Sequence, residues 1–340
     1  MKTIKSSLVA TAVIATLAAP AFAADVTIYG RAHLSADHLD NGDDSAIKVS
    51  SNSSRLGFKA STKLENGLEA LVQVEQEVFF NDGSGSWTSR DSFVGLKGDF
   101  GLVRLGKFDT PHKIIRSRTD MFGDRVGDAR NITRQAGAFD ERFNQSIHYQ
   151  SPSFNGVTFD FVYSAETAQS TEASNDTNQI STSVTYTAKG LYLAAAYESR
   201  GDFALIDGEL KDSKSLRLGA YYDISSAFRV AALYQSISDV AGGDRDVYGI
   251  GASYKMGEYT LRGQYYVAGD NDTDDTGAGM LAVGIDRSLG KDLTLYAVYG
   301  ITSNDDNAAF NIAHQARSSR LGPVVGEDIS GLSLGIIYNF

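Results

Sequence analysis

Positively charged side chains recur at alternate positions in several segments of this sequence. Arg31 shares one side of such a segment with Tyr29, and Arg55 shares one side of another with Lys59. Fixed cations at a narrow passage of low dielectric raise the local concentration of anions by electrostatic focusing. These residues therefore indicate the attraction of anions rather than bond making. The basic residues expected on the polar face of such segments are Arg31, Arg55, Lys59, Arg90, Arg217, Arg229 and Arg262.

The histidines give no sign of a catalytic centre. A nucleophile or an activated water molecule would need a histidine and a carboxylate close by. The five histidines are scattered along the chain, with no Gly-x-Ser-x-Gly or His-Glu-x-x-His motif near them. The absence of cysteine also excludes disulfides and thiolate metal sites. We therefore expect no enzyme and no resident cofactor. The histidines are His33, His38, His112, His148 and His314.

The segments that carry these charges read as β-strands. Near the C-terminus, Leu334, Ile336 and Tyr338 alternate with residues that are small or polar except for one. A period of two is that of a strand with one apolar face. We count about sixteen such strands, all expected to be antiparallel. They start near Val26, Ser53, Gly67, Ser89, Gly101, Asn144, Val157, Gln179, Leu191, Lys214, Phe228, Asp246, Glu258, Met280, Leu293 and Ile329.

The connections between these strands alternate between short and long. Turns at one end and loops at the other are what an up-and-down transmembrane barrel requires. In hydrocarbon every backbone N–H and C=O must be paired, and a sheet loses its free edges only by closing on itself. About sixteen strands then leave a lumen that is wide enough to hold water. The long connections, rich in Asp, Asn, Gly and Ser, are predicted at residues 39–52, 166–178, 200–213, 269–279 and 303–328.

The first residues read as an export signal. Lys2 and Lys5 precede an apolar stretch at residues 8–19, and the run 21–23 is a small-x-small cleavage site. We therefore predict a signal peptide at residues 1–23 and a barrel domain at residues 24–340. Only 4 prolines occur in the whole chain, as expected where most residues need a ladder hydrogen bond.

Several stretches, in the same order from end to end of the mature chain, resemble the general-diffusion porins of Gram-negative bacteria, the trimeric type of beta- and gammaproteobacteria. The stretches are Val-Thr-Ile-Tyr-Gly at 26–30, Ser-Arg-Leu-Gly-Phe-Lys at 54–59, Phe-Val-Gly-Leu-Lys-Gly-Asp-Phe-Gly at 93–101, Val-Arg-Leu-Gly-Lys at 103–107, Ser-Ile-His-Tyr-Gln-Ser-Pro at 146–152 and the terminal strand that ends at Phe340.

The resemblance implies a sixteen-stranded barrel whose third external loop, residues 108–143, folds inward to narrow the pore. It also implies an arginine ladder on the wall, and the positions that match are Arg55, Arg90 and Arg142. We expect Arg31 and Lys59 to extend this basic wall, and the loop to face it with charges that create a transverse field. The loop residues are Asp109, Lys113, Arg116, Arg118, Asp120, Asp124, Arg125 and Asp128.

The resemblance also implies partners. A homotrimer in the cell outer membrane would contact lipid and lipopolysaccharide, and we expect no nucleic acid. Tyr338 and Phe340 resemble the terminal signal that the barrel-assembly machinery reads. Ca²⁺ or Mg²⁺ could bridge acidic loops to lipopolysaccharide, since Asp270, Asp272 and Asp274 have carboxylates at alternate positions. Gly277 interrupts the calcium-loop pattern, so a solvated loop is the preferred interpretation.

The expected function is passive diffusion of small hydrophilic solutes and ions through a pore that is weakly anion-preferring or nearly unselective. Most of the net charge of −11 is expected in external loops, where salt screens it. The alternative is a substrate-specific channel for oligosaccharides or phosphate. Tyrosines on the inward face would serve such a channel, namely Tyr29, Tyr192, Tyr221, Tyr266 and Tyr296.

Overall fold

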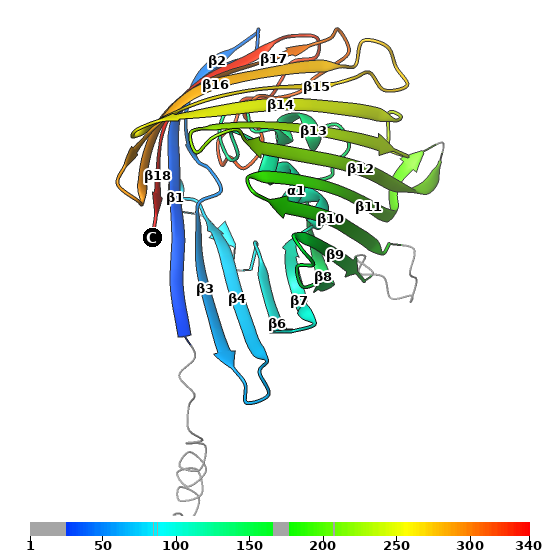
Figure 1. Ribbon diagram of the computed structural model, residues 1–340. Coiled ribbons are helices and arrows are strands. Elements are labelled where there is room, and N and C mark those ends of the chain that lie inside the picture. The colour runs from blue at the N-terminus through cyan, green and yellow to red at the C-terminus, as the bar shows by residue number, and fades with distance from the viewer. Residues whose placement is uncertain (1–24, 84, 87, 166–176, 207) are drawn as a thin grey trace, which may run out of the picture.

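The computed structural model describes residues 25–83, 85–86, 88–165, 177–206 and 208–340. The predicted signal peptide, and residues 166–176 of one predicted loop, lie outside the described residues. The described chain forms one antiparallel sheet of 18 strands that encloses two short helices, α1 (Pro111–Thr119) and α2 (Arg130–Thr133) (Figure 1). No helix of the described residues is long and apolar enough to cross a membrane.

Sixteen of the strands form a closed barrel, as predicted. Each pairs with the next along the chain, and β18 closes the ring by pairing with β1, where Arg31 lies opposite Asn339. Every predicted start falls within a few residues of the observed one. The barrel strands are β1 (Asp25–Asp40), β3 (Arg55–Lys63), β4 (Glu69–Val78), β6 (Ser92–Gly98), β7 (Gly101–Asp109), β8 (Arg142–Gln150), β9 (Val157–Ser164), β10 (Gln179–Ala188), β11 (Leu191–Ile206), β12 (Glu209–Asp223), β13 (Phe228–Ser238), β14 (Arg245–Met256), β15 (Tyr259–Ala268), β16 (Ala278–Leu289), β17 (Leu293–Asn304) and β18 (Ile329–Asn339).

Two of the predicted loops are wrong, because they contain strand. Residues 39–52 include β2 (Ser45–Ser51), which pairs with the second half of β1, and β5 (Gly85–Ser86) is a further short strand. Residues 200–213 are mostly a continuation of the hairpin β11–β12. In β2 only Ile47 and Val49 alternate with polar residues, and in the β11–β12 extension the residues 203–206 are apolar at consecutive positions, so a sustained alternation is absent from both.

Side chains alternate between the two faces of the wall. Leu332 and Leu334 are 48% and 59% exposed, whereas Ser333 between them is buried. The hairpin β6–β7, whose sequence carries apolar residues on both faces, follows the same rule. Val94 and Leu96 point outward, and the ring of Phe93 packs inward against Phe108 at a centroid distance of 6.4 Å. Apolar residues therefore cover the outside of the barrel.

The segment 110–141 lies inside the barrel, where α1 contacts the strands β9 to β13 (Figure 1). The α1 helix begins with Thr110, whose hydroxyl accepts a hydrogen bond from the backbone N–H of Lys113, and Pro111 occupies the first turn. Thr110 thus caps the N–H groups that would otherwise be unpaired at this helix end.

Inward glycines leave room for this segment. A Cβ atom on Gly219 would lie 2.3 Å from Ile115, and one on Gly284 would lie 2.9 Å from Phe122. Phe122 and Val126 are fully buried in the cluster that fills this side of the barrel. We call this surface the docking wall, and its glycines are Gly219, Gly251, Gly284 and Gly300.

Candidate functional site

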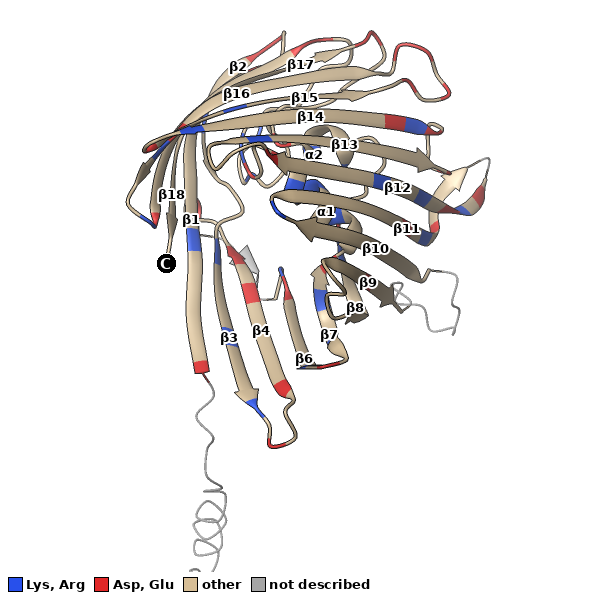
Figure 2. Cartoon of the chain, viewed as in Figure 1, with Lys and Arg blue, Asp and Glu red and all other residues tan. Residues whose placement is uncertain are grey.

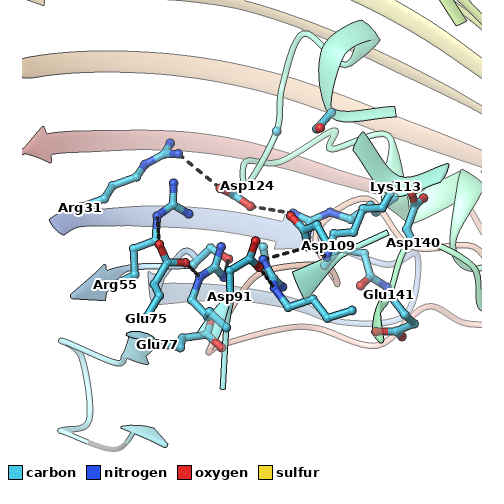
Figure 3. A pocket seen from close by; sticks show the side chains of 18 of the residues that line it. Arg31, Arg55, Glu75, Glu77, Asp91, Asp109, Lys113, Asp124, Asp140 and Glu141 are labelled. Carbon is cyan, nitrogen blue, oxygen red and sulfur yellow. Dashed lines mark hydrogen bonds and ion pairs between the residues drawn. The ribbon is translucent and has the colours of Figure 1, made fainter. Parts of the chain in front are cut away.

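Beside the docked segment, the lumen holds a cavity of about 1080 Å³. It lies between the inner faces of β1, β3, β4 and β8 on one side and the segment 110–141 on the other, and Figure 3 shows side chains from both sides pointing into it. Its lining is dominated by charge. The basic residues are Arg31, Arg55, Arg90, Lys113, Arg116, Arg130, Arg134, Arg142 and Arg320, and the acidic residues are Glu75, Glu77, Asp91, Asp109, Asp124, Asp140 and Glu141.

Glu75 organises one end of the charged lining. Its carboxylate lies 2.5 Å from Nε of Arg90 and 4.0 Å from Nε of Arg55. It also accepts a hydrogen bond of 2.9 Å from the hydroxyl of Tyr29. Residues of one face of a strand repeat every second position, so β1, β3 and β4 each send one of these side chains inward. The charge-assisted hydrogen bond fixes the position of Arg90, whereas Arg55 is attracted by the same carboxylate at a longer distance.

Arg142 connects the wall to the inner segment. Its guanidinium lies 2.7 Å from a carboxylate oxygen of Asp91 and 3.0 Å from Asp109. Lys113 approaches the same Asp109 carboxylate at 2.9 Å, as Figure 3 shows. Burial lowers the pKa of Lys113 to about 8, although the Asp109 carboxylate opposes the shift. This lysine is therefore the cation of the cavity that titrates closest to neutral pH.

Asp124 lies between the wall and the inner segment. Its carboxylate is 2.7 Å from Arg130 and 3.4 Å from Arg31, which reaches it from β1 (Figure 3). Burial favours a raised pKa of Asp124, but Arg130 and Arg31 outweigh burial and hold the pKa well below its usual range. The carboxylate is thus ionised at any pH at which the barrel would work.

Five of the residues predicted for the constriction lie outside this cavity. Arg125 binds Asp286 at 2.6 Å on the docking wall. The other four are placed as follows: Lys59 lies over the ring of Tyr29, Arg118 points to a different cavity, Asp120 pairs with Arg116, and Asp128 is buried against Arg130. Burial, with Asp128 nearby, raises the pKa of Asp120 to about 6. The predicted residues that do line the cavity are Arg31, Arg55, Arg90, Asp109, Lys113, Arg116, Asp124 and Arg142.

Acidic residues on the wall were missed by the sequence prediction. Glu75 and Glu77 alternate with Val74 and Val78 in β4, so the strand pattern itself could have placed them inward. Because they and Asp91 stand among the arginines, the charges form local ion pairs instead of one basic wall facing one acidic loop. The predicted transverse field is weakened accordingly.

A second external loop also reaches the cavity. Arg320 and His314, from the long connection between β17 and β18, line it and lie 3.0 Å apart. Burial, and the charges of Arg320 and Arg134, lower the pKa of His314, so the imidazole is neutral at pH 7. The described salt bridges include none to Arg320, which is exposed. The sequence of residues 303–328 has no periodicity from which their position in the lumen could have been predicted.

The side chains that line the cavity are basic on balance. Nine basic and seven acidic side chains give a net charge of +2, although the whole chain carries −11. The acidic excess lies elsewhere, for example in the exposed loop between β15 and β16, which is marked in red in Figure 2. There Asp270 accepts hydrogen bonds from Thr276 and Gly277 of its own loop. Among the described residues, no cluster of His, Asp or Glu side chains could hold a metal ion.

Comparisons with known proteins agree with this architecture. A family model described as Gram-negative porin matches residues 10–307. Outer membrane porin protein 32 of Delftia acidovorans is 29% identical, over 99% of this chain and 100% of its own length. A monosaccharide porin of a Halomonas species is 26% identical over 99% of this chain and 100% of its own. The anion-selective porin from Comamonas acidovorans is a similar structure, with a TM-score of 0.82 and 25% identity over 93% of this chain and 100% of that one.

Proposed function

Because the chain belongs to the Gram-negative porin family, we propose that its charged cavity is the eyelet through which small anions pass somewhat more readily than cations. The protein is an outer-membrane porin, a channel for passive diffusion of small hydrophilic solutes and ions. The proposal concerns the sign of its ion selectivity, that is, whether anions or cations pass more readily.

The observation that carries the proposal is the net charge of +2 on the side chains that line the cavity. A charge inside a passage with low-dielectric walls acts on every ion that crosses, because little water screens it. Charges on external loops act through bulk electrolyte, where the Debye length is about 8–10 Å, and so contribute less. The similar structure from Comamonas acidovorans is named as anion-selective, which supports the same sign.

The excess of +2 is small and is divided among ion pairs, so we expect a weak preference. Arg90 and Arg142 are each tied to carboxylates at 2.5–2.7 Å. A solute therefore encounters nearly compensated charge at these two arginines. Arg320, which has no carboxylate partner in the described chain, supplies one of the two positive charges of this excess.

Assembly partners are part of the proposal. The family likeness supports a homotrimer, and the exposed apolar side chains of the outer face would meet lipid or a neighbouring subunit. Phe340, the proposed assembly signal, exchanges backbone hydrogen bonds with Gly30 of β1, and its ring covers that glycine. Chemical cross-linking of the detergent-solubilised protein tests the trimer, with a single species of monomer mass as the contradicting result. Divalent-cation bridges from acidic loops to lipopolysaccharide stay a prediction.

Reversal potentials in a planar bilayer test the selectivity. With a KCl gradient across a membrane that holds the purified protein, we expect a modest reversal potential of the sign that chloride permeation produces. A clear potential of the opposite sign would show that the cavity charge does not control permeation. Absence of any ion current would contradict the channel itself.

A further inference from the structure

A second cavity, of about 720 Å³, lies on the other side of α1. It shares no lining residue with the eyelet cavity. Its walls are the inner faces of β9 to β12 and the short turns at residues 98–101 and 150–153, so it opens toward the end of the barrel that carries the short turns. The volume is within the range of about 300–1,000 Å³ that is typical of small-molecule sites.

One wall of this cavity is a patch of hydroxyl groups. Thr158 of β9 lies directly opposite Thr185 of β10, and Asp160 lies directly opposite Ser183. All four side chains line the cavity. No other side chain or backbone group of the described chain makes a hydrogen bond with the hydroxyls of Thr158, Thr185 or Ser183. Each hydroxyl is therefore free to donate one hydrogen bond and to accept others.

A pair of tyrosines forms the adjoining wall. The rings of Tyr192 and Tyr221 are stacked, with centroids 5.1 Å apart and planes 15° from parallel. The guanidinium of Arg229 lies 4.0 Å from the centre of the Tyr221 ring, so a cation–π contact also holds Tyr221. Tyr192 is 5% exposed, and its hydroxyl has no hydrogen-bond partner within the described structure. A buried hydroxyl without a partner is costly, so this group is a further place for a polar ligand to bind.

The charges that line this cavity cancel. Lys97 and Arg118 supply two positive charges, and Asp99 and Asp160 supply two negative ones. Asp160 is engaged by His148 and Gln150, each at 2.9 Å, whereas Arg118 is exposed on the last turn of α1 and has no described ion pair. A balanced set of donors and acceptors offers an anion no net attraction. It suits a neutral molecule that has hydroxyl groups of its own.

We propose that this cavity is a binding subsite for a neutral, monosaccharide-sized, polyhydroxylated solute on the short-turn side of the eyelet. The proposal rests on the porin function, since the solute reaches the cavity through the pore. Thr185, Ser183 and the hydroxyl of Tyr192 bind solute hydroxyls, and Arg118 donates to a solute oxygen. The subsite makes the passage of such solutes saturable, whereas ions pass without saturation.

Current-noise analysis of single channels in a planar bilayer tests the proposal, with D-glucose added on the short-turn side in 1 M KCl. We expect glucose to produce noise that saturates with concentration. Each of Tyr192→Phe and Thr185→Val removes hydrogen bonding with little change of shape. We expect each to weaken the apparent affinity roughly two- to tenfold, the range for loss of one hydrogen bond. The matched control is Thr294→Val, an inward threonine of β17 that lines neither cavity.

The outcomes separate this inference from the proposed function. Noise that grows without saturation in the unmodified protein, or equal glucose affinity in all three variants, overturns the subsite while KCl conductance leaves the porin function intact. Saturation by sodium phosphate or sodium glucuronate but not by glucose overturns the choice of a neutral solute. If KCl itself carries no current, both the function and the subsite fall. Unchanged KCl conductance in the variants shows that each has folded.

Discussion

The two walls of the barrel interior differ sharply, although the same strand pattern builds both. On the docking wall, inward glycines and apolar residues stand among a few buried polar ones that bond to the inner segment, and the segment 110–141 packs closely there: Phe122, Val126 and Ile132 are fully buried. On the opposite wall, β1, β3 and β4 send charged residues inward, and the eyelet cavity remains open. The comparison indicates that the pore runs where the inner segment cannot dock. Glycines on one wall therefore decide the position of the eyelet as much as arginines on the other.

The largest expected effect comes from breaking the buried ion pair that fastens the inner segment. Asp140 of this segment and Arg217 of β12 lie 2.5 Å apart and are both inaccessible to solvent. Asp140→Ala leaves the Arg217 charge buried without this partner, which costs about 3–5 kcal/mol. Urea unfolding in detergent measures the loss. The control is Asp223→Ala, whose partner Arg229 is 39% exposed, with an expected cost of about 0–1 kcal/mol. Equal losses would mean that the buried pair does not anchor the segment.

A smaller effect is expected from adding one methyl group to the docking wall. Gly219→Ala places a Cβ atom 2.3 Å from Ile115, so α1 must move, and overpacking of this kind costs about 1–3 kcal/mol. Because α1 carries Lys113, we also expect an altered single-channel conductance. The same substitution at Gly263, where the nearest atom would be 3.9 Å away, should leave the conductance unchanged. A Gly219→Ala channel with unaltered conductance and stability would show that close packing here is unimportant.

On the charged wall, Arg320→Gln should change selectivity without changing stability. The substitution lowers the net charge of the cavity lining from +2 to +1, so the reversal potential in a KCl gradient moves toward the cation side. An exposed side chain without an ion pair contributes within about 0.5 kcal/mol to unfolding. Arg287→Gln removes the same charge from an outer pair, 3.7 Å from Glu258, and serves as the control. A similar shift in both variants would assign selectivity to the overall charge rather than to the eyelet.

The smallest effect is a dependence of selectivity on pH. Since the pKa of Lys113 is lowered to about 8, its charge is present at pH 7 and lost by pH 9. The anion preference should decline over this interval, and Lys113→Met should abolish the decline. The folded protein also binds fewer protons here than the unfolded chain, so Lys113 makes the barrel more stable as pH rises from about 8 toward 10.5. A decline of equal size in Lys113→Met would point to another group.

The fold was predictable from the sequence because lipid imposes a simple rule on each strand. Alternation located all sixteen barrel strands, but it did not locate β2 (Ser45–Ser51), where only Ile47 and Val49 alternate with polar residues, or the end of the β11–β12 hairpin, where residues 203–206 are consecutively apolar. Within the charged wall, Arg55, Arg90 and Arg142 were placed from sequence, whereas Glu75 and Asp91 were overlooked as their partners. Pairing depends on register between strands, and one strand read alone carries no information on register.

Nothing in the sequence predicts that Arg320 and His314 line the eyelet cavity. Residues 303–328 have neither period two nor a helical period, so their path into the lumen follows from tertiary packing alone. Arg317 in this loop is buried in a salt bridge with Asp37 of β1, a contact that only the closed barrel brings together. The functional roles of the individual charged residues stay predictions until permeation is measured.

The central claim is that water and ions follow the charged wall and are excluded from the docking wall. The chain has no cysteine, so a single introduced cysteine reports directly on access. We predict that Arg55→Cys, lining the cavity, reacts with a sulfonate-bearing methanethiosulfonate reagent during recording and that the current falls. Ala282→Cys, at a fully buried position of the docking wall, should not react. Rapid modification at position 282 with no change of current at position 55 would contradict the account.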